Sequence, residues 1–133
     1  MSLVFLDTVG LLALWNRNDP WRAEAKTAFD GIIAEGRKCT TTSFVLLECG
    51  NAAARQPFRR DVVELRESLE AKQLLIHPTE HDWKQAWPAY QRGEAGAAGI
   101  VDHVSFVIMR RLGISDAFTN DRHFTAAGFH TLF

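Results

Sequence analysis

The sequence is poor in several features that mark particular protein classes. Cysteine occurs only twice, at Cys39 and Cys49, with no CxxC pair. Both lie in apolar surroundings, which indicates two buried free thiols and argues against a structural disulfide. The apolar runs, of which residues 9–15 are typical, are far too short to span a bilayer. The 133 residues contain no internal repeat, low-complexity tract or linker, so we expect one domain over residues 1–133.

Charge of one sign is also lacking. The formal net charge is −1, with 15 Lys and Arg against 16 Asp and Glu. No global positive field attracts nucleic acid, and such a partner would have to be held by a local basic patch or through metal ions. Residues 1–6 have no basic leader of the signal-peptide kind, and Asp7 interrupts their apolar stretch. We therefore expect a cytoplasmic protein that does not associate with membranes.

Apolar periodicity predicts an α/β fold. Segments typical of strands lie at residues 3–6, 38–42, 74–77, 114–118 and 129–133. Segments with helical spacing lie at residues 9–15, 19–35, 43–55, 57–72, 80–91 and 102–111. Asp19 and Ser43 are the expected N-caps of two of these helices, and Gly36 is expected to end the first of the two. Strands alternating with helices favour a three-layer α/β/α sandwich with a small central parallel sheet.

Two acidic residues follow predicted strands directly. Asp7 comes after strand 3–6, and Asp121 comes just after strand 114–118. Ligands of open parallel sheets collect at the carboxyl ends of the strands, which favours a functional site. Each residue would also serve as the N-cap of the helix that follows it. Taken singly, each position fits either role.

Glu48 and Asp102 lie in apolar helices. Glu48 is surrounded by apolar residues and has no Lys or Arg three or four positions away, so a buried carboxylate there needs a hydrogen bond or a metal. The alternative is a narrow exposed stripe of Glu48, Asn51 and Arg55. Asp102 opens its helix, where an acid is also favourable to the helix dipole. Ser105, three residues on, would face the same site.

Four carboxylates at such positions can converge on one crevice. The cluster would repel itself without a cation, and oxygen ligands suit Mg²⁺ or Mn²⁺ better than zinc. The five histidines form no HExxH motif and do not pair with the cysteines. Asp116, inside the last long strand segment, is interpreted as structural, although it competes with Asp121 for the fourth place.

These residues resemble those of PIN-domain ribonucleases, and especially VapC-type toxins of bacterial toxin–antitoxin systems. The resemblance covers nearly the whole chain and rests on Val4-Phe5-Leu6-Asp7-Thr8, Asn18-Asp19-Pro20-Trp21, Thr40 to Glu48, Asp102 with Ser105 and Phe106, Ala117-Phe118-Thr119-Asn120-Asp121-Arg122-His123-Phe124 and Gly128-Phe129. One departure is Arg22, where the family often has histidine after Pro-Trp.

The resemblance implies a metal-dependent endoribonuclease that leaves 5′-phosphate and 3′-hydroxyl ends. Asp7, Glu48 and Asp102 would bind or orient Mg²⁺ or Mn²⁺ and its water, and Asp121 would complete the site. Thr8, Thr119 and Ser105 would support the carboxylates by hydrogen bonds. The implied partners are RNA, an antitoxin protein and a second copy in a homodimer.

The RNA would be gripped by arginine side chains, for which a solvated surface is the alternative: Arg17, Arg22, Arg55, Arg59, Arg60 and Arg122. The aromatic residues are numerous, and we expect most in the core and some at a dimer interface or an antitoxin groove: Trp15, Trp21, Trp83, Trp87 and Tyr90.

Two other functions compete with this hypothesis. One is a non-catalytic PIN-like module that binds RNA or protein, which would not need a mutually repelling acidic cluster. The other is metal-independent RNA cleavage with His103 and His123 as acid and base. A haloacid-dehalogenase-type phosphatase is excluded because it needs a second Asp two residues after Asp7, where this chain has Val9.

Overall fold

Strand β1 (Val4–Leu6) lies at the centre of a five-stranded parallel sheet in the computed structural model, which describes residues 3–133. Its three side chains are at most 1% exposed, which explains the unbroken apolar run. The other strands are β2 (Cys39–Thr42), β3 (Leu75–Ile76), β4 (Asp116–Phe118) and β5 (His130–Thr131), in the order β3-β2-β1-β4-β5. The predicted parallel sheet is confirmed, and each strand is shorter than the segment predicted for it.

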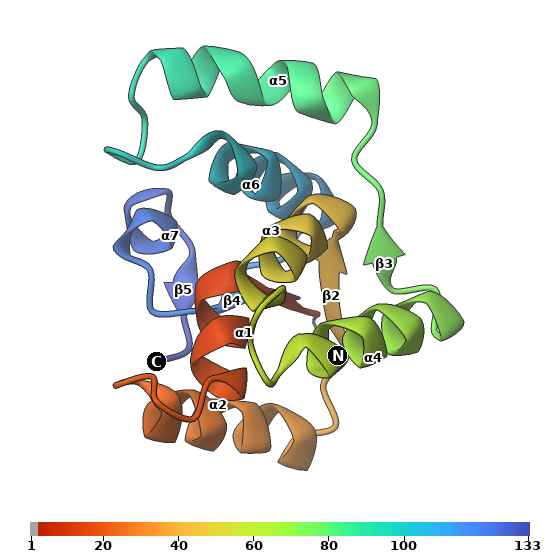
Figure 1. The fold of residues 1–133 in the computed structure, drawn as a ribbon. Coiled ribbons are helices and arrows are strands. Elements are labelled where there is room, and N and C mark those ends of the chain that lie inside the picture. The colour runs from red at the N-terminus through yellow and green to blue at the C-terminus, as the bar shows by residue number, and fades with distance from the viewer. Residues whose placement is uncertain (1–2) are drawn as a thin grey trace.

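Helices cover both faces of this sheet. Within residues 3–133 they are α1 (Thr8–Trp15), α2 (Arg22–Ala34), α3 (Ser43–Ala53), α4 (Arg59–Ala71), α5 (Glu80–Gln91), α6 (Ile100–Leu112) and α7 (Arg122–Ala126). The chain moves from β1 to β2 and β3 through α1–α4, then returns past β1 to β4 and β5 through α5–α7. Because such crossovers are right-handed, the two groups cover opposite faces. Figure 1 shows α5 and α6 at the top and α2 and α4 at the bottom, which confirms the predicted three-layer sandwich.

The register between β1 and β4 positions the site. Leu6 lies opposite Phe118, so Asp7 and Thr119 leave the sheet side by side. Helix α1 starts at once and packs tightly on the end of β4: a Cβ atom on Gly10 would lie 2.0 Å from the Phe118 carbonyl oxygen. Glycine at this position therefore allows α1, with Asp7 at its start, to approach the sheet closely.

Two predicted N-caps, Asp19 and Ser43, are wrong. Asp19 does not cap α2. Its carboxylate accepts the Trp21 N–H at 2.8 Å and shapes the turn before a helix that begins at Arg22. The N-cap of α3 is Thr42 and not Ser43, because the Thr42 hydroxyl accepts the Val45 N–H at 3.2 Å.

The cysteines are free thiols, as predicted, although their burial differs. Cys49 is buried, and burial raises the pKa of its thiol to about 12. Cys39 is only half-buried. No helix in residues 3–133 is long and apolar enough to cross a membrane.

Candidate active site

Asp7 occupies the N-cap of α1 and is almost fully buried. Its Oδ2 atom accepts a hydrogen bond from the Thr119 hydroxyl at 2.8 Å and one from the Val9 N–H at 3.3 Å. The side chain is 2% exposed. Both roles foreseen for Asp7 are therefore compatible: the carboxylate caps a helix and also faces the neighbouring strand end.

Thr119 connects Asp7 to the segment that carries Asp121. The Thr119 hydroxyl, while donating to Asp7, accepts the Asp121 N–H at 3.1 Å. Asp121 in turn caps α7, since its Oδ1 atom accepts the His123 N–H at 2.9 Å. One buried hydroxyl thus fixes the spacing between two acidic residues.

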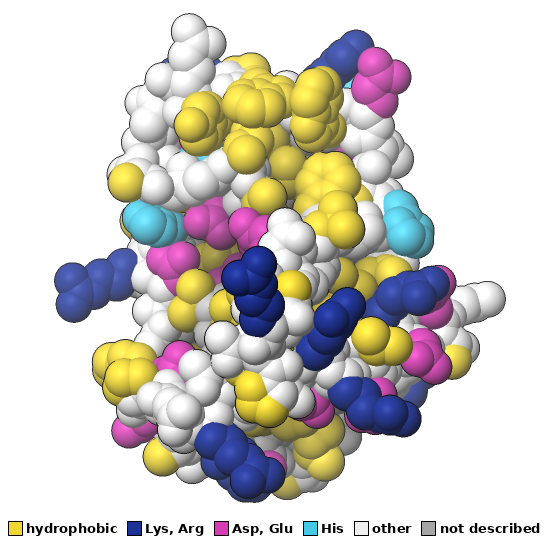
Figure 2. All heavy atoms as spheres, in the orientation of Figure 1, with side chains coloured by type: hydrophobic (Ala, Val, Ile, Leu, Met, Phe, Trp, Pro, Cys, Tyr) yellow, Lys and Arg dark blue, Asp and Glu magenta, His cyan; other side chains and the backbone are white. Residues whose placement is uncertain are grey.

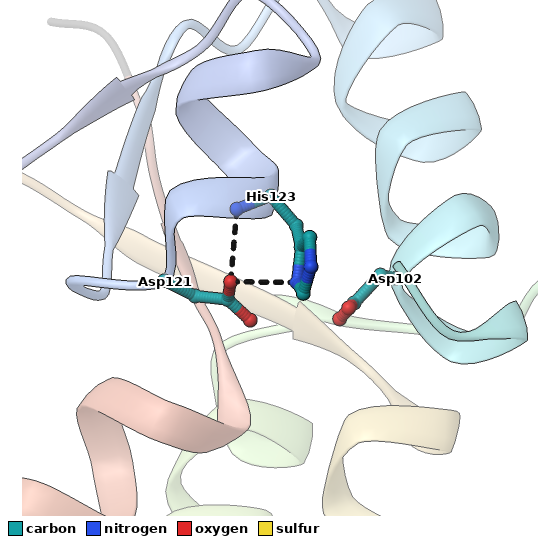
Figure 3. A group of neighbouring side chains, drawn as sticks. All are labelled: Asp102, Asp121 and His123. Atoms are coloured by element: carbon teal, nitrogen blue, oxygen red, sulfur yellow. Dashed lines mark hydrogen bonds and ion pairs between the residues drawn. The ribbon is translucent and has the colours of Figure 1, made fainter. Parts of the chain in front are cut away.

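Asp102 and His123 join Asp121 at the open side of this site. Figure 3 shows the three side chains pointing toward one another from α6 and from the start of α7. One ligand atom from each lies within 4.8 Å of the others. The His123 ring nitrogen Nδ1 is 2.9 Å from Asp121 Oδ1. Each residue of this group is half-buried, so the group is open to solvent on one side.

Glu48 reaches the same region from α3. Its Oε1 atom accepts a hydrogen bond from the Thr8 hydroxyl at 2.6 Å. The expectation that Glu48 is buried in an apolar helix is met only in part, because Glu48 is half-buried and the neighbouring Leu47 is 67% exposed. The partner of the carboxylate is therefore a hydroxyl group at the edge of the site.

The electrostatics show that the carboxylates lie close enough to interact. The pKa of Asp7 is raised to about 7, mainly by burial, with contributions from the charges of Asp102 and Asp121. Burial also raises the pKa of Asp102 to about 6, with contributions from the charges of Asp121 and Glu48 and an opposing hydrogen bond from the Gly99 backbone. The site thus holds more negative charge than the protein alone stabilises at neutral pH.

The arrangement matches a known family. A model of the PIN domain matches residues 4–130. The chain belongs to the PIN domain family. It is 29% identical over 132 residues to the 23S rRNA-specific endonuclease VapC20 of Mycobacterium tuberculosis, in strains CDC 1551 / Oshkosh and ATCC 25618 / H37Rv. The alignment covers 96% of this chain and 95% of VapC20.

The PIN domain fold is shared with a solved structure. The crystal structure of Mycobacterium tuberculosis VapC20, a toxin that cleaves the sarcin–ricin loop, matches with a TM-score of 0.78 and 30% identity. The match covers 96% of both chains. The family resemblance inferred from the motifs is confirmed.

The donor set of this PIN domain fits a divalent cation. Among residues 3–133, Asp102, Asp121 and His123 are the residues whose ligand atoms lie close enough together to hold a metal ion, and this group does not include Asp7 or Glu48. The two carboxylates supply oxygen atoms, which Mg²⁺ and Mn²⁺ prefer. From the sequence, His123 is expected only as an acid or base, but the structure brings its ring nitrogen beside the carboxylates. The available signal was its position, two residues after Asp121.

Ser105 and Asp116 form no hydrogen bond with the four acids in residues 3–133. Ser105 is fully buried, and its hydroxyl has no hydrogen-bond partner in residues 3–133. Asp116 forms an ion pair with Arg37 at 2.8 Å and a contact with His130 at 3.1 Å, which confirms its structural role. The charges that raise the pKa of Asp7 and Asp102 do not include that of Asp116.

The six arginines have different surroundings. The Arg22 side chain donates a hydrogen bond to the Leu14 carbonyl at 3.2 Å, so it binds the backbone at the end of α1. Arg60 forms an exposed ion pair with Glu64 at 3.0 Å. The remaining four are exposed: Arg17, Arg55, Arg59 and Arg122.

Proposed function

We propose that the protein is a metal-dependent endoribonuclease whose site is formed by Asp7, Glu48, Asp102 and Asp121. The observation that carries this proposal is the convergence of acidic side chains at one place: Asp102, Asp121 and His123 offer ligand atoms within 4.8 Å of one another. Burial raises the pKa of Asp7 and of Asp102, and the charges of neighbouring acids add to both shifts. A bound cation would relieve the repulsion between these negatively charged carboxylates. The similarity to VapC20 extends over nearly the whole chain, and VapC20 is an RNA endonuclease. This similarity supports RNA as the substrate.

The chain's own groups would hold and orient the reacting parts. Bound there, Mg²⁺ or Mn²⁺ would supply Lewis acidity, making hydroxide available near neutral pH and neutralising charge on the attacked phosphate. Thr119 and Thr8 each donate to one carboxylate, Asp7 and Glu48 respectively, and fix its orientation. Water then adds to phosphorus, the bond to the 3′-oxygen breaks, and that oxygen leaves with a proton. The products are a 5′-phosphate and a 3′-hydroxyl.

An antitoxin partner is part of the proposal, since VapC20 is a toxin. A hollow of about 450 Å³ between α2 and α4 is lined by apolar side chains such as Phe29, Ile33 and Leu69. Its lining also carries the cations Lys38 and Lys72, together with Arg37, which pairs with Asp116, and contains no carboxylate. This combination supports a partner segment with apolar and acidic side chains.

A homodimer is the second proposed assembly, through the outer face of α5. Trp83, Trp87 and Tyr90 are each about two-fifths exposed, and their rings meet edge to face. Figure 2 shows hydrophobic side chains gathered at the top of the molecule, where α5 lies in Figure 1. Sedimentation equilibrium of the wild type and of Trp87→Ser tests this assembly: we expect a dimer for the first and a monomer for the second.

A non-catalytic RNA- or protein-binding module is the competing function, and one experiment separates the two. Structured RNA is incubated with protein stripped by EDTA, and again after excess Mg²⁺ or Mn²⁺ is added. We expect cleavage only with metal, 5′-phosphate ends, and at least a hundredfold loss in Asp121→Asn. Full cleavage without metal, or 2′,3′-cyclic phosphate ends, would contradict the mechanism. Binding without any cleavage would support the non-catalytic module.

A further inference from the structure

A polar hollow lies where α1 and α3 end. Its volume is about 420 Å³, which is ample for one nucleobase. Its lining includes Trp15, Arg17, Asn18, Gln56, Phe58 and Asp61. The four acids of the candidate active site do not line it. The hollow is therefore a separate feature of the surface.

Three of the polar side chains that line the hollow, Arg17, Gln56 and Asp61, are not engaged, in the part of the chain that the structure describes, in contacts that stabilise the fold. The Asn16 side-chain oxygen accepts the Asn18 N–H at 3.0 Å and shapes the turn after α1. Within residues 3–133, the side chains of Arg17, Gln56 and Asp61 form no hydrogen bond or ion pair, not even with one another. A guanidinium and a carboxylate that line one hollow without pairing leave room for a ligand with both acceptors and donors.

These groups match the edges of guanine. A guanidinium donates to the O6 and N7 atoms of guanine, which is the commonest base-specific contact of arginine. A carboxylate accepts from the N1–H and the exocyclic amino group on the opposite edge, where adenine has no such pair of donors. Trp15, which is half-buried, adds aromatic surface on which an unstacked base can lie, and the buried Phe58 forms part of the floor of the hollow.

The hollow is placed to receive the same RNA strand as the acidic cluster. Asp7 starts α1 and Trp15 ends it, so eight residues of helix separate them by roughly 12 Å. Gln56 lies just beyond the end of α3, the helix that carries Glu48. Figure 2 shows Lys and Arg side chains on this face below the acidic side chains. Arg55 precedes Gln56 in the chain, and its exposed side chain adds positive charge beside the hollow.

We propose that this hollow binds an unstacked guanine of the RNA substrate, with Arg17 donating to O6 and N7 and Asp61 accepting from N1 and the amino group. The inference rests on the proposed ribonuclease function, which it deepens by naming a base-specific subsite. Binding there positions the strand so that a phosphate at a fixed distance reaches the carboxylates. Cleavage sites therefore carry guanine at one fixed offset from the cut.

A binding experiment tests the subsite without requiring cleavage. The Asp121→Asn protein in EDTA is titrated with a short oligouridylate that contains one central guanosine, inosine or adenosine, and fluorescence anisotropy is recorded. We expect guanosine to bind about 5- to 150-fold more tightly than adenosine, the range that one good bidentate contact provides. Inosine, which lacks the amino group, should lie between them. Adding Asp61→Asn and Arg17→Gln should abolish the preference.

Glu67→Gln is the matched control, because Glu67 is also an exposed acid of α4 but does not line this hollow. It should leave the guanosine preference unchanged. Equal affinity for guanosine and adenosine overturns the inference, and so does a preference that survives in the Asp61→Asn, Arg17→Gln protein.

A cleavage experiment separates this inference from the ribonuclease proposal. Wild-type protein and Mg²⁺ are added to RNA of randomised sequence, and the new 5′ ends are sequenced. Guanine enriched at one offset, and lost in Asp61→Asn with Arg17→Gln, supports the subsite. Cleavage without such enrichment overturns it. If the wild type does not cleave but prefers guanosine in binding, the subsite stands and the ribonuclease proposal falls.

Discussion

The Thr119 hydroxyl donates to Asp7 Oδ2 at 2.8 Å, in a buried contact between residues 112 positions apart in the sequence. The contact closes the ends of β1 and β4, which pair in register up to Leu6 and Phe118. Because the same hydroxyl accepts the Asp121 N–H, it positions the backbone of the second acid as well.

Thr119→Val should shift the pH dependence of cleavage. The hydrogen bond from Thr119 lowers the pKa of Asp7, so its loss moves that pKa above about 7. A hydrogen bond to a charged group contributes about 1.5–3 kcal/mol, which corresponds to roughly 1 to 2 pH units. We expect the rising limb of metal-dependent cleavage to move upward by that amount. Thr119→Ser keeps the hydroxyl and should retain the wild-type profile; an unshifted profile in Thr119→Val would contradict the assigned contact.

Asp7→Asn should stabilise the metal-free protein at neutral pH. Between about pH 4 and 7, folded Asp7 holds a proton that the unfolded chain has released, so the free energy of unfolding falls as pH rises. The shift sets an upper bound of about 4 kcal/mol, and we expect a gain of about 1–3 kcal/mol at about pH 8 for the variant in EDTA. The gain should shrink steadily as pH is lowered toward 4.

The pH dependence of the unfolding free energy must be compared between the wild type and Asp7→Asn, because another group changes stability with pH in the opposite direction. Burial lowers the pKa of His103, so below about pH 6.5 this residue removes stability as pH falls. Subtracting the unfolding free energies of the wild type and Asp7→Asn, measured by urea denaturation in EDTA, cancels that contribution. Parallel pH curves for the two proteins would show that Asp7 ionises normally.

Gly10→Ala should destabilise the fold and displace Asp7. The new methyl group would lie 2.0 Å from the Phe118 carbonyl oxygen, and backbone atoms cannot move aside easily. Overpacking of this kind costs about 1–3 kcal/mol or more. Gly31→Ala in α2 is the control, because nothing lies within 4 Å of its Cβ position, and it should gain up to about 1 kcal/mol. A Gly10→Ala protein as stable as Gly31→Ala would contradict the close approach of α1.

Arg111→Met should loosen α5 from α6. Two nitrogen atoms of Arg111 donate to the Asp82 carboxylate, which is 2% exposed and also completes the capping box of α5 with Thr79. Removing the partner of a buried charge costs about 2–4 kcal/mol. Lys84→Met breaks an exposed pair with Glu80 and should cost less than about 1 kcal/mol. Thermal melts of both variants measure the difference, and equal losses would contradict the assigned role of Asp82.

Most of the architecture could be predicted from the apolar periodicity of the sequence and from the positions at which the predicted strands end. Asp7 could be placed because an unbroken apolar run ends directly before it, and parallel strands end at the same edge of a sheet. The roles of cap and site residue, between which the sequence left Asp7 and Asp121 open, do not exclude each other in the structure, because both side chains cap a helix and lie near other acids.

Features that depend on tertiary contacts could not be predicted. The exposure of Leu47 follows from which side of α3 faces α1 and α4, and local sequence does not state this. The hollow at Arg17 and Asp61 joins two turns that are far apart in the chain. Thr42 rather than Ser43 caps α3 because the helix begins at Ser43, directly after β2 ends. Both residue types are common N-caps, so local sequence does not decide between them.

Calorimetric titration of Mn²⁺ into EDTA-stripped protein, in buffers of different ionisation enthalpy, tests the central claim most directly. The pKa is about 7 for Asp7 and about 6 for Asp102, so both carboxyl groups are partly protonated near pH 6. If the two residues share one metal site, the cation must displace these protons when it binds. We predict release of roughly one proton or more per ion near pH 6, little release near pH 8.5, and tighter binding at the higher pH. Binding without pH-dependent proton release, or no binding at either pH, would contradict a shared metal site formed by these carboxylates.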